Sequence, residues 1–303
     1  MNVVITGATS FIGIGILKKL LEDEDIRIWA VIRPNSINKH RIPRHKHIQI
    51  IELDMTQIDK LDLYIHESID VFYHLAWEGI RGPERDDAAL QEKNYLSAMD
   101  AFYISWKLNC HKFIGSGSQA EYGSMSGIIT EEYPCNPNTE YGRAKLQVCQ
   151  EIKAIAKKHQ IEFIWGRIFS VYGIGDYMGS LVMTCVDKML KGENVELTKC
   201  IQEWDYLYID EAAEIFVKFG ITDCKSGIYN IASGKHQQLK DYVEIIKRLT
   251  GSDSQLEYGK VPYPAKGMVS FIPDISKLKG EIHWESEITF EEGIKHILQG
   301  WKR

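Results

Sequence analysis

The chain has 303 residues, with 36 Lys and Arg against 42 Asp and Glu, so its formal net charge is −6. This acidic balance excludes a basic nucleic-acid binder. With 44% hydrophobic and 26% charged residues, and 24 Gly against 8 Pro, the composition is globular and excludes disordered and collagen-like chains. The length allows one large domain or two fused lobes.

The cysteines and the apolar runs indicate the compartment. Six cysteines, at 110, 135, 149, 185, 200 and 224, form no CxxC pair, so we interpret them as reduced packing residues. The chain enters an apolar run at Val3–Ile5 without the basic start of a signal peptide. No apolar run reaches the roughly 18–20 residues of a membrane span. We expect a cytoplasmic protein that needs neither a membrane nor a metal.

Apolar runs alternate with amphipathic stretches through the first half of the chain. The runs predict strands at Val3–Ile5, Ile28–Ile32, Ile48–Leu53, Val71–Leu75, Phe113–Ile114 and Phe163–Ile168. The stretches between them predict helices at 11–22, 57–67, 86–108 and 140–158. Continuous Val, Ile and Leu runs separated by helices are typical of a parallel sheet that is covered on both faces. We therefore predict an α/β fold with a doubly wound parallel sheet.

The pattern loosens after about residue 171, and no linker or internal repeat separates the two halves. We expect a helix near 178–191, short strands near 195–208 and 227–231, and helices at 239–249 and 289–300. These elements predict a sheet domain at 1–170 and a smaller, mixed α/β lobe at 171–303. Part of 203–231 is expected to return to the sheet of the first domain.

A glycine-containing turn joins the first strand to the first helix. In a Rossmann turn the first Gly permits a tight bend, the middle position approaches a pyrophosphate and the last lets helix pack on strand. Here Gly7, Ser10 and Gly13 take those positions, with Phe11 and Ile12 between the last two. The turn predicts a dinucleotide-binding domain of the Rossmann type. The alternative is an ordinary turn of small residues, which is common in α/β proteins.

Arg33 ends the second strand, where a fold that prefers NAD places an acidic residue against the ribose 2′-hydroxyl. The segment 33–51 contains no Asp or Glu. Because a guanidinium can bind a 2′-phosphate bidentately, we expect NADP(H) as the preferred cofactor, with NAD(H) as the other choice. Asp54 and Met55 follow the third strand, where Asp54 is placed to accept from the adenine amino group or to cap a helix.

Tyr141 and Lys145 lie at i and i+4 at the start of a predicted helix and therefore share one face. A nearby ammonium favours the tyrosinate and brings the pKa of the phenol, ordinarily about 10, toward the working pH of a proton donor. The same lysine can bind ribose hydroxyls. Tyr103 and Lys107 repeat the spacing, but they lie inside the predicted crossover helix 86–108, with no hydroxyl partner at a strand end.

A loop rich in small polar residues follows the predicted strand Phe113–Ile114, at the edge where open α/β sheets bind ligands. Ser118 in this loop can donate to a substrate carbonyl oxygen while Tyr141 protonates it and a nicotinamide supplies hydride. Ser116 and Ser118 could instead serve only the backbone of the turn. The combination with Tyr141 and Lys145 favours the catalytic interpretation.

Further motifs accompany these residues along nearly the whole chain. They are TGATSFIG at 6–13, His74-Leu75-Ala76, Asn94, SGSQAEYG at 116–123, Tyr141 with Lys145, 167–173, 204–210 and Tyr229-Asn230-Ile231. As a set they resemble the extended short-chain dehydrogenase/reductase family, which is also described as the NAD-dependent epimerase/dehydratase family and acts mostly on nucleotide-activated sugars.

The resemblance implies a Rossmann domain for the dinucleotide and a C-terminal lobe for a nucleotide sugar. It gives Ser118, Tyr141 and Lys145 the family's catalytic roles. It also implies a homodimer that packs the helices 86–108 and 140–158 of two subunits. The matching positions that would line the cofactor or the active site are Leu75, Ala76, Asn94, Phe169 and Val171.

Several departures from the family pattern bear on the reaction and the substrate. Gln119 and Ala120 stand where the family's 4,6-dehydratases carry an acidic pair, so dehydration is not expected. Ser170 replaces a common Asn, and Trp204 replaces an Arg that binds the substrate diphosphate. Trp77 is either a wall of the sugar pocket or an aromatic residue at the core edge. The expected substrate-binding residues are Trp77, Arg81, Ser118, Gln119 and Ser170, with Arg81, Arg85 or Lys188 as substitutes for the diphosphate contact.

Arg33 favours a reductase that consumes NADPH over an epimerase that recycles NAD+. We therefore expect a reductase of a nucleotide-linked 4-keto sugar, such as a 4-keto-6-deoxyhexose, with Tyr141 as the proton donor. One alternative is a nucleotide-sugar 4-epimerase with tightly bound NAD+. Another is a nonenzymatic, redox-sensing dinucleotide binder, which would need no Tyr141–Lys145 pair.

Overall fold

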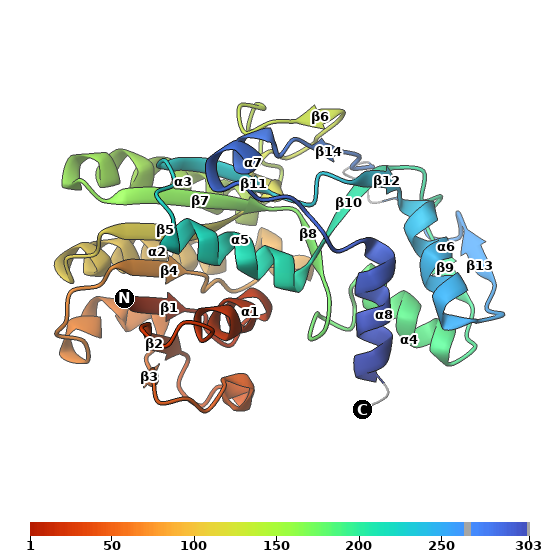
Figure 1. The fold of residues 1–303 in the computed structure, drawn as a ribbon. Coiled ribbons are helices and arrows are strands. Elements are labelled where there is room, and N and C mark those ends of the chain that lie inside the picture. The colour runs from red at the N-terminus through yellow and green to blue at the C-terminus, as the bar shows by residue number, and fades with distance from the viewer. Residues whose placement is uncertain (264–267, 302–303) are drawn as a thin grey trace.

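A computed structural model of the protein describes residues 1–263 and 268–301. Its main unit is a parallel sheet of seven strands in the order β11-β7-β5-β4-β1-β2-β3 (Figure 1). The strands are β1 (Asn2–Thr6), β2 (Arg27–Ile32), β3 (Ile48–Glu52), β4 (Val71–His74), β5 (Lys112–Ser118), β7 (Glu162–Ile168) and β11 (Gly227–Ile231). The order reverses at β1, so the predicted doubly wound α/β fold is confirmed.

Helices cover both faces of this sheet. Successive side chains of β1 point to opposite faces and are buried in two different cores. Val3 and Ile5 belong to one hydrophobic core, whereas Val4 belongs to the other. The first core packs under α1 (Phe11–Leu20) and α5 (Ile209–Ile221). The second packs under η2 (Met55–Leu63), α2 (Ala88–Lys107) and α3 (Glu140–His159). A sheet buried on both faces requires the continuous apolar runs of the sequence.

The remaining elements form a smaller lobe beside the carboxyl ends of the strands (Figure 1). Its core is built between a three-stranded sheet, a strand pair and three helices. These are β8 (Ser170–Tyr172), β10 (Glu203–Tyr208), β12 (His236–Gln238), β9 (Val195–Leu197), β13 (Leu256–Tyr258), α4 (Leu181–Leu190), α6 (Leu239–Thr250) and α8 (Phe290–Trp301). Between β10 and β12 the chain returns to the seven-stranded sheet. There α5 packs on α1, and β11 pairs with β7.

Short elements complete the fold. The strand pair β6 (Ile128–Ile129) and β14 (Ile272–Pro273) lies near α7 (Ser276–Ile282), which packs on β11. Three further 3-10 helices are η1 (Ile37–Arg41), η3 (Gly82–Asp86) and η4 (Gln119–Glu121). No helix within the described ranges is long and apolar enough to cross a membrane. All six cysteines are free thiols.

Two elements differ from the sequence prediction. The stretch 57–67, expected as an amphipathic helix, forms the 3-10 helix η2 only as far as Leu63, and Gln57 interrupts this helix with non-helical dihedral angles. The strand expected at Phe113–Ile114 continues to Ser118, so the polar residues assigned to a loop belong to β5. Gly115 permits this extension, since a Cβ there would lie 2.3 Å from the Trp165 ring on the neighbouring strand.

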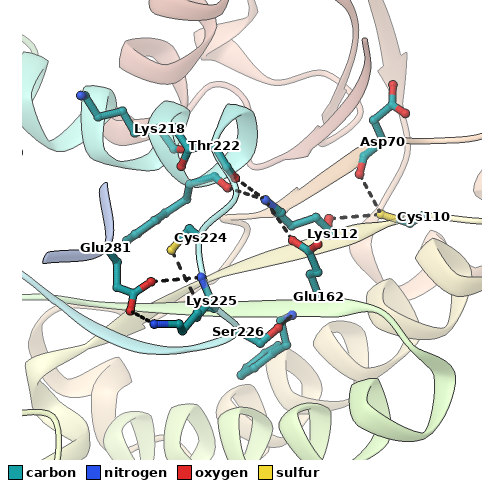
Figure 2. Close-up of polar contacts among 12 residues, drawn as sticks. Asp70, Cys110, Lys112, Glu162, Lys218, Thr222, Cys224, Lys225, Ser226 and Glu281 are labelled. Carbon is teal, nitrogen blue, oxygen red and sulfur yellow. Dashed lines mark hydrogen bonds and ion pairs between the residues drawn. The ribbon is translucent and has the colours of Figure 1, made fainter. Parts of the chain in front are cut away.

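Lys112 joins the end of α5 to the sheet. It lies at the amino end of β5, opposite the carboxyl end where the polar residues of this strand lie. Figure 2 shows its side chain reaching the end of α5, where Nζ donates to Phe219 O at 3.1 Å and Thr222 O at 2.8 Å. The same ammonium pairs with Glu162 on β7 at 3.0 Å. The buried ammonium therefore supplies a donor to the Phe219 carbonyl oxygen at the end of the helix and a second donor to Thr222 O, which also accepts from Cys224 N–H at 3.0 Å.

We predict that Lys112→Met lowers the free energy of unfolding by about 1–3 kcal/mol, because it removes the donor to the buried carbonyl oxygen of Phe219. Urea denaturation measures this difference. Lys107→Met is the matched control, since it removes a lysine whose ion pair with Asp62 is solvent-exposed. That change should cost less than about 1 kcal/mol. Equal losses in the two variants would contradict the role assigned to Lys112.

Candidate active site

The turn after β1 leaves no room for side chains at its two glycines. Gly7 has a φ of +68°, and a Cβ there would lie 2.7 Å from Ala76 N at the end of β4. A Cβ on Gly13 would lie 2.5 Å from Gly7 O. Ser10 caps α1, where its Oγ accepts from Gly13 N at 3.0 Å. This backbone cradle at a helix N-terminus is suited to a pyrophosphate group.

A pocket of about 190 Å³ opens beside this turn, at the point where the strand order reverses. Eight of the predicted cofactor residues line it: Gly7, Ser10, Arg33, Asp54, Met55, Leu75, Ala76 and Asn94. The sequence analysis missed Thr9, Val31, Ile32, Asn38, Glu78, Lys93 and Ser97. Ser97 lies one helical turn after Asn94, so the helical period could have revealed it.

The other predicted residues of the cofactor site lie outside this pocket. Phe11 and Ile12, in the first turn of α1, pack against the core of the smaller lobe. Phe169 is buried against Phe271, with ring centroids 5.2 Å apart. Val171 lies on β8 between two cores. Their predicted contacts with a cofactor stay predictions.

Tyr141 and Ser118 are brought together by the close approach of α3 and η4. A Cβ on Gly142 would lie 2.4 Å from Ala120 O, so only a glycine lets the helix start so near. Tyr141 is buried. Burial raises the pKa of the Tyr141 phenol, whereas the hydrogen bond with the Ser118 side chain and the charge of Arg85 lower it. The predicted lowering of this pKa by Lys145 was therefore wrong, because burial outweighs the nearby charges, and the phenol is protonated in the resting site.

Lys145 lies one turn further along α3, beneath two indole rings. Its Nζ donates to Ser116 O at 2.6 Å and lies 3.7 Å from the centroid of Trp77. The centroid of the Trp165 ring is 5.7 Å away. Burial lowers the pKa of Lys145 to about 7, and the charge of Glu121 opposes that shift.

Trp77 connects the pocket with the candidate catalytic side chains. Of the two alternatives predicted for it, the structure supports an aromatic residue at the core edge, because Trp77 packs against the second core, and it also lines the pocket beside the glycine turn. Its ring stands edge-on to Tyr141 at 6.2 Å, and its Nε1 donates to Gln91 at 2.8 Å. Trp77 therefore separates the pocket from Lys145.

A buried ion pair between Glu121 and Arg167 lies beneath Ser118. The carboxylate accepts from Arg167 Nε at 2.7 Å, Trp165 Nε1 at 2.9 Å and the backbone N–H of Ser118 at 2.8 Å. Both charged side chains are almost fully buried. No sequence pattern indicated this pair, because its members lie 46 positions apart and the motifs at 116–123 and 167–173 that contain them do not show that they meet.

The other residues predicted for the sugar lie on several different elements. Arg85 lies over the Tyr141 ring at 4.9 Å. Arg81 pairs with Asp176 at 3.7 Å, across to the smaller lobe. Gln119 Oε1 is buried and accepts no hydrogen bond from the described part of the chain. Ser170 lies on β8. Contacts of these residues with a substrate stay predictions.

Comparison with known proteins agrees with this geometry. The model of the NAD dependent epimerase/dehydratase family matches residues 3–232. The chain belongs to that family. The predicted family is thus confirmed, and this family member is an NAD-dependent enzyme of the extended short-chain dehydrogenase/reductase type.

Three known proteins are similar to this chain over most of its length. CDP-abequose synthase of Salmonella muenchen is 26% identical, over 98% of this chain and 97% of its own. A dTDP-6-deoxy-L-talose 4-dehydrogenase (NAD(+)) of Aggregatibacter actinomycetemcomitans is 26% identical, over 80% and 88%. UDP-glucose 4-epimerase of Thermotoga maritima, solved with UDP-glucose, has a TM-score of 0.88 at 21% identity and covers 100% and 99%. The last likeness shows the shared fold.

We predict that Gly117→Ala disturbs the support of Ser118. A Cβ there would lie 2.2 Å from Trp165 Nε1 and 2.7 Å from Glu121 Oε1, so the indole must leave the carboxylate. The expected loss of unfolding free energy is about 1–3 kcal/mol, accompanied by a changed near-ultraviolet circular dichroism of the tryptophans. Gly280→Ala is the control, because a Cβ on Gly280 meets nothing within 4 Å. An unchanged denaturation midpoint for Gly117→Ala would refute this account.

Proposed function

We propose that the protein is an NAD(P)H-dependent reductase of a nucleotide-linked 4-keto sugar, with a 4-keto-6-deoxyhexose as the expected substrate. The observation that carries the proposal is the convergence of Ser118, Tyr141 and Lys145 next to Trp77, which lines the pocket beside the glycine turn. A relative named for 4-dehydrogenation of a dTDP-linked 6-deoxy sugar supports the same carbon and the same class of sugar.

In this proposal each side chain has a separate task. The bound dinucleotide supplies hydride to the carbonyl carbon. Tyr141 gives its proton to the carbonyl oxygen, which becomes a hydroxyl, and the Ser118 hydroxyl donates a hydrogen bond to that oxygen. The Lys145 ammonium stabilises the resulting tyrosinate until a proton from solvent restores the phenol.

A dehydratase is disfavoured by the charge distribution around Ser118. Elimination of water needs an acid and a base next to the reacting hydroxyl. Gln119 and Ala120 supply neither, and the carboxylate of Glu121 is buried against Arg167. Glu121 therefore cannot replace the missing acidic pair.

The competing proposal, a 4-epimerase with tightly bound NAD+, would use the same three side chains. The two differ in whether hydride leaves with the product or returns to the same carbon. Purified protein that carries stoichiometric NAD+ and interconverts two sugars without added cofactor would decide for the epimerase. Arg33 by itself predicts NADP(H). Its guanidinium is paired with the Glu78 carboxylate at 2.7 Å, and this carboxylate affects the choice between NADP(H) and NAD(H).

The homodimer predicted from the family resemblance stays a proposal. Leu96 and Trp106 are about half exposed and lie on one side of α2, which supports pairing through this helix. A cytoplasmic location is likewise proposed, and the six free thiols suit a reducing compartment.

We predict that Tyr141→Phe lowers turnover of the 4-keto sugar about 10²–10⁴-fold, because the proton donor is lost while the ring is kept. NADH and NADPH oxidation with CDP-, GDP-, UDP- and dTDP-linked 4-keto sugars is the measurement. Tyr103→Phe is the control, since Tyr103 has the same spacing to Lys107 but is exposed on α2. Its turnover should be that of the unmodified chain. Failure with all four nucleotide classes would reject the reductase.

We also predict a basic limb in the pH profile. Because burial lowers the pKa of Lys145 to about 7, the ammonium is lost as pH rises through about 7. The ratio kcat/KM for the dinucleotide, which reports groups of the free enzyme, should fall over that range. Lys145→Arg keeps its charge and should move the limb to higher pH, even at reduced turnover. Lys157→Arg, on the exposed side of α3, should leave the limb in place. A limb at the same pH in Lys145→Arg would assign it to another group.

A further inference from the structure

Two charged residues meet across the dinucleotide pocket. Arg33 follows β2 and Glu78 lies in the segment after β4, and β2 and β4 are the two neighbours of β1 in the sheet. Arg33 Nη1 lies 2.7 Å from Glu78 Oε1, and both residues line the pocket. The carboxylate that the end of β2 lacks is therefore supplied from the end of β4.

The position of Glu78 is fixed by the helix behind it. The Asn94 side chain accepts from the backbone N–H of Glu78 at 3.0 Å and donates to its carbonyl oxygen at 3.0 Å. Asn94 is buried, so this backbone segment is held against α2. The neighbouring Lys93 approaches the Glu78 carboxylate at 3.8 Å. Glu78 thus has two cations beside it and little freedom to move its backbone away.

The charges lining the pocket cancel. Among the described residues, its lining contains the cations Arg33 and Lys93 and the anions Asp54 and Glu78. A phosphate monoester carries a charge of about −1.5 to −2 at neutral pH. A 2′-phosphate at Arg33 would compete with Glu78 for the guanidinium and would lie beside the Glu78 carboxylate, whose second cation, Lys93, is 3.8 Å away. The uncharged 2′-hydroxyl of NAD(H) meets no such repulsion, and a carboxylate can accept its hydrogen bond.

We propose that Glu78 makes the pocket select NAD(H) over NADP(H) by holding the Arg33 guanidinium and keeping a carboxylate beside the ribose site. This inference reverses the preference that Arg33 predicts by itself. The inference rests on the proposed function only because it takes the pocket as the dinucleotide site. It gives Glu78 a role in cofactor specificity and no role in the chemical step.

The test is the affinity of the full chain, freed of bound dinucleotide, for NAD+ and NADP+ by calorimetry without any sugar. The unmodified protein should bind NAD+ at least about tenfold more tightly, a difference of about 1.4 kcal/mol. In Glu78→Gln the preference should fall about tenfold, mainly because NADP+ binds more tightly. Since the charges are partly exposed, the preference of the unmodified protein should also shrink as ionic strength rises.

Glu52→Gln is the matched control. Glu52 pairs with Lys39 at 2.6 Å and is as exposed as Glu78, but it does not line the pocket. Its ratio of affinities should equal that of the unmodified protein. The proposal is overturned if the unmodified protein prefers NADP+, or if Glu78→Gln leaves the ratio unchanged.

The outcomes separate this inference from the proposed reaction. A ratio that shifts as expected, in a protein that reduces none of the 4-keto sugars, supports the role of Glu78 and rejects only the reductase. Reduction of a 4-keto sugar by a protein whose affinity ratio is insensitive to Glu78→Gln rejects only the role of Glu78. Both side chains are on the surface, so the thermal midpoints of the two variants should match and exclude misfolding.

Discussion

The site depends on one buried ion pair, Glu121 with Arg167. A carboxylate removed from water is stable only when its oxygens are satisfied by charge and by hydrogen bonds. Glu121 meets this condition with three donors from two strands, and one of them is the backbone N–H of Ser118. The backbone of the proposed catalytic serine is thus attached to a fully buried, hydrogen-bonded carboxylate. Its hydroxyl is held separately, because Ser118 Oγ accepts from the backbone N–H of Ala120 at 3.2 Å.

The same pair sets the electrostatics above it. Within the described ranges Lys145 contacts no carboxylate; its ammonium lies on a carbonyl oxygen and close to two indole rings. A buried amine in such a place loses much of its preference for the charged form, and Glu121 restores part of it from a distance. The negative charge is held where it influences the proton on Lys145 without accepting it. Because the Glu121 carboxylate is paired with Arg167, the only acidic residue on η4 is not available to react with a substrate.

Local patterns in the sequence predicted much of the fold and part of the site. The parallel sheet follows from apolar runs, the cradle from Gly7 and Gly13, and the Tyr141–Lys145 pair from its helical spacing. The pairs Arg33–Glu78 and Glu121–Arg167 could not be predicted in this way, because their members lie 45 and 46 positions apart and meet only through the strand order. The end of β5 was misjudged for a similar reason. Gly115 and Gly117 are typical of a loop, and only the Trp165 ring on the next strand shows why they belong to a strand.

The return of the chain to the first sheet has a consequence for how the protein can be divided. A cut near residue 170, where the composition changes, would remove β11 from β7 and α5 from α1. In the first fragment β7 would then be an unpaired, apolar edge strand, and the face of α1 that packs on α5 would be exposed. Such surfaces favour aggregation over folding. The two lobes are therefore distinct in space but not independent along the chain, and any exchange of the substrate lobe between relatives has to carry 209–231 with the sheet.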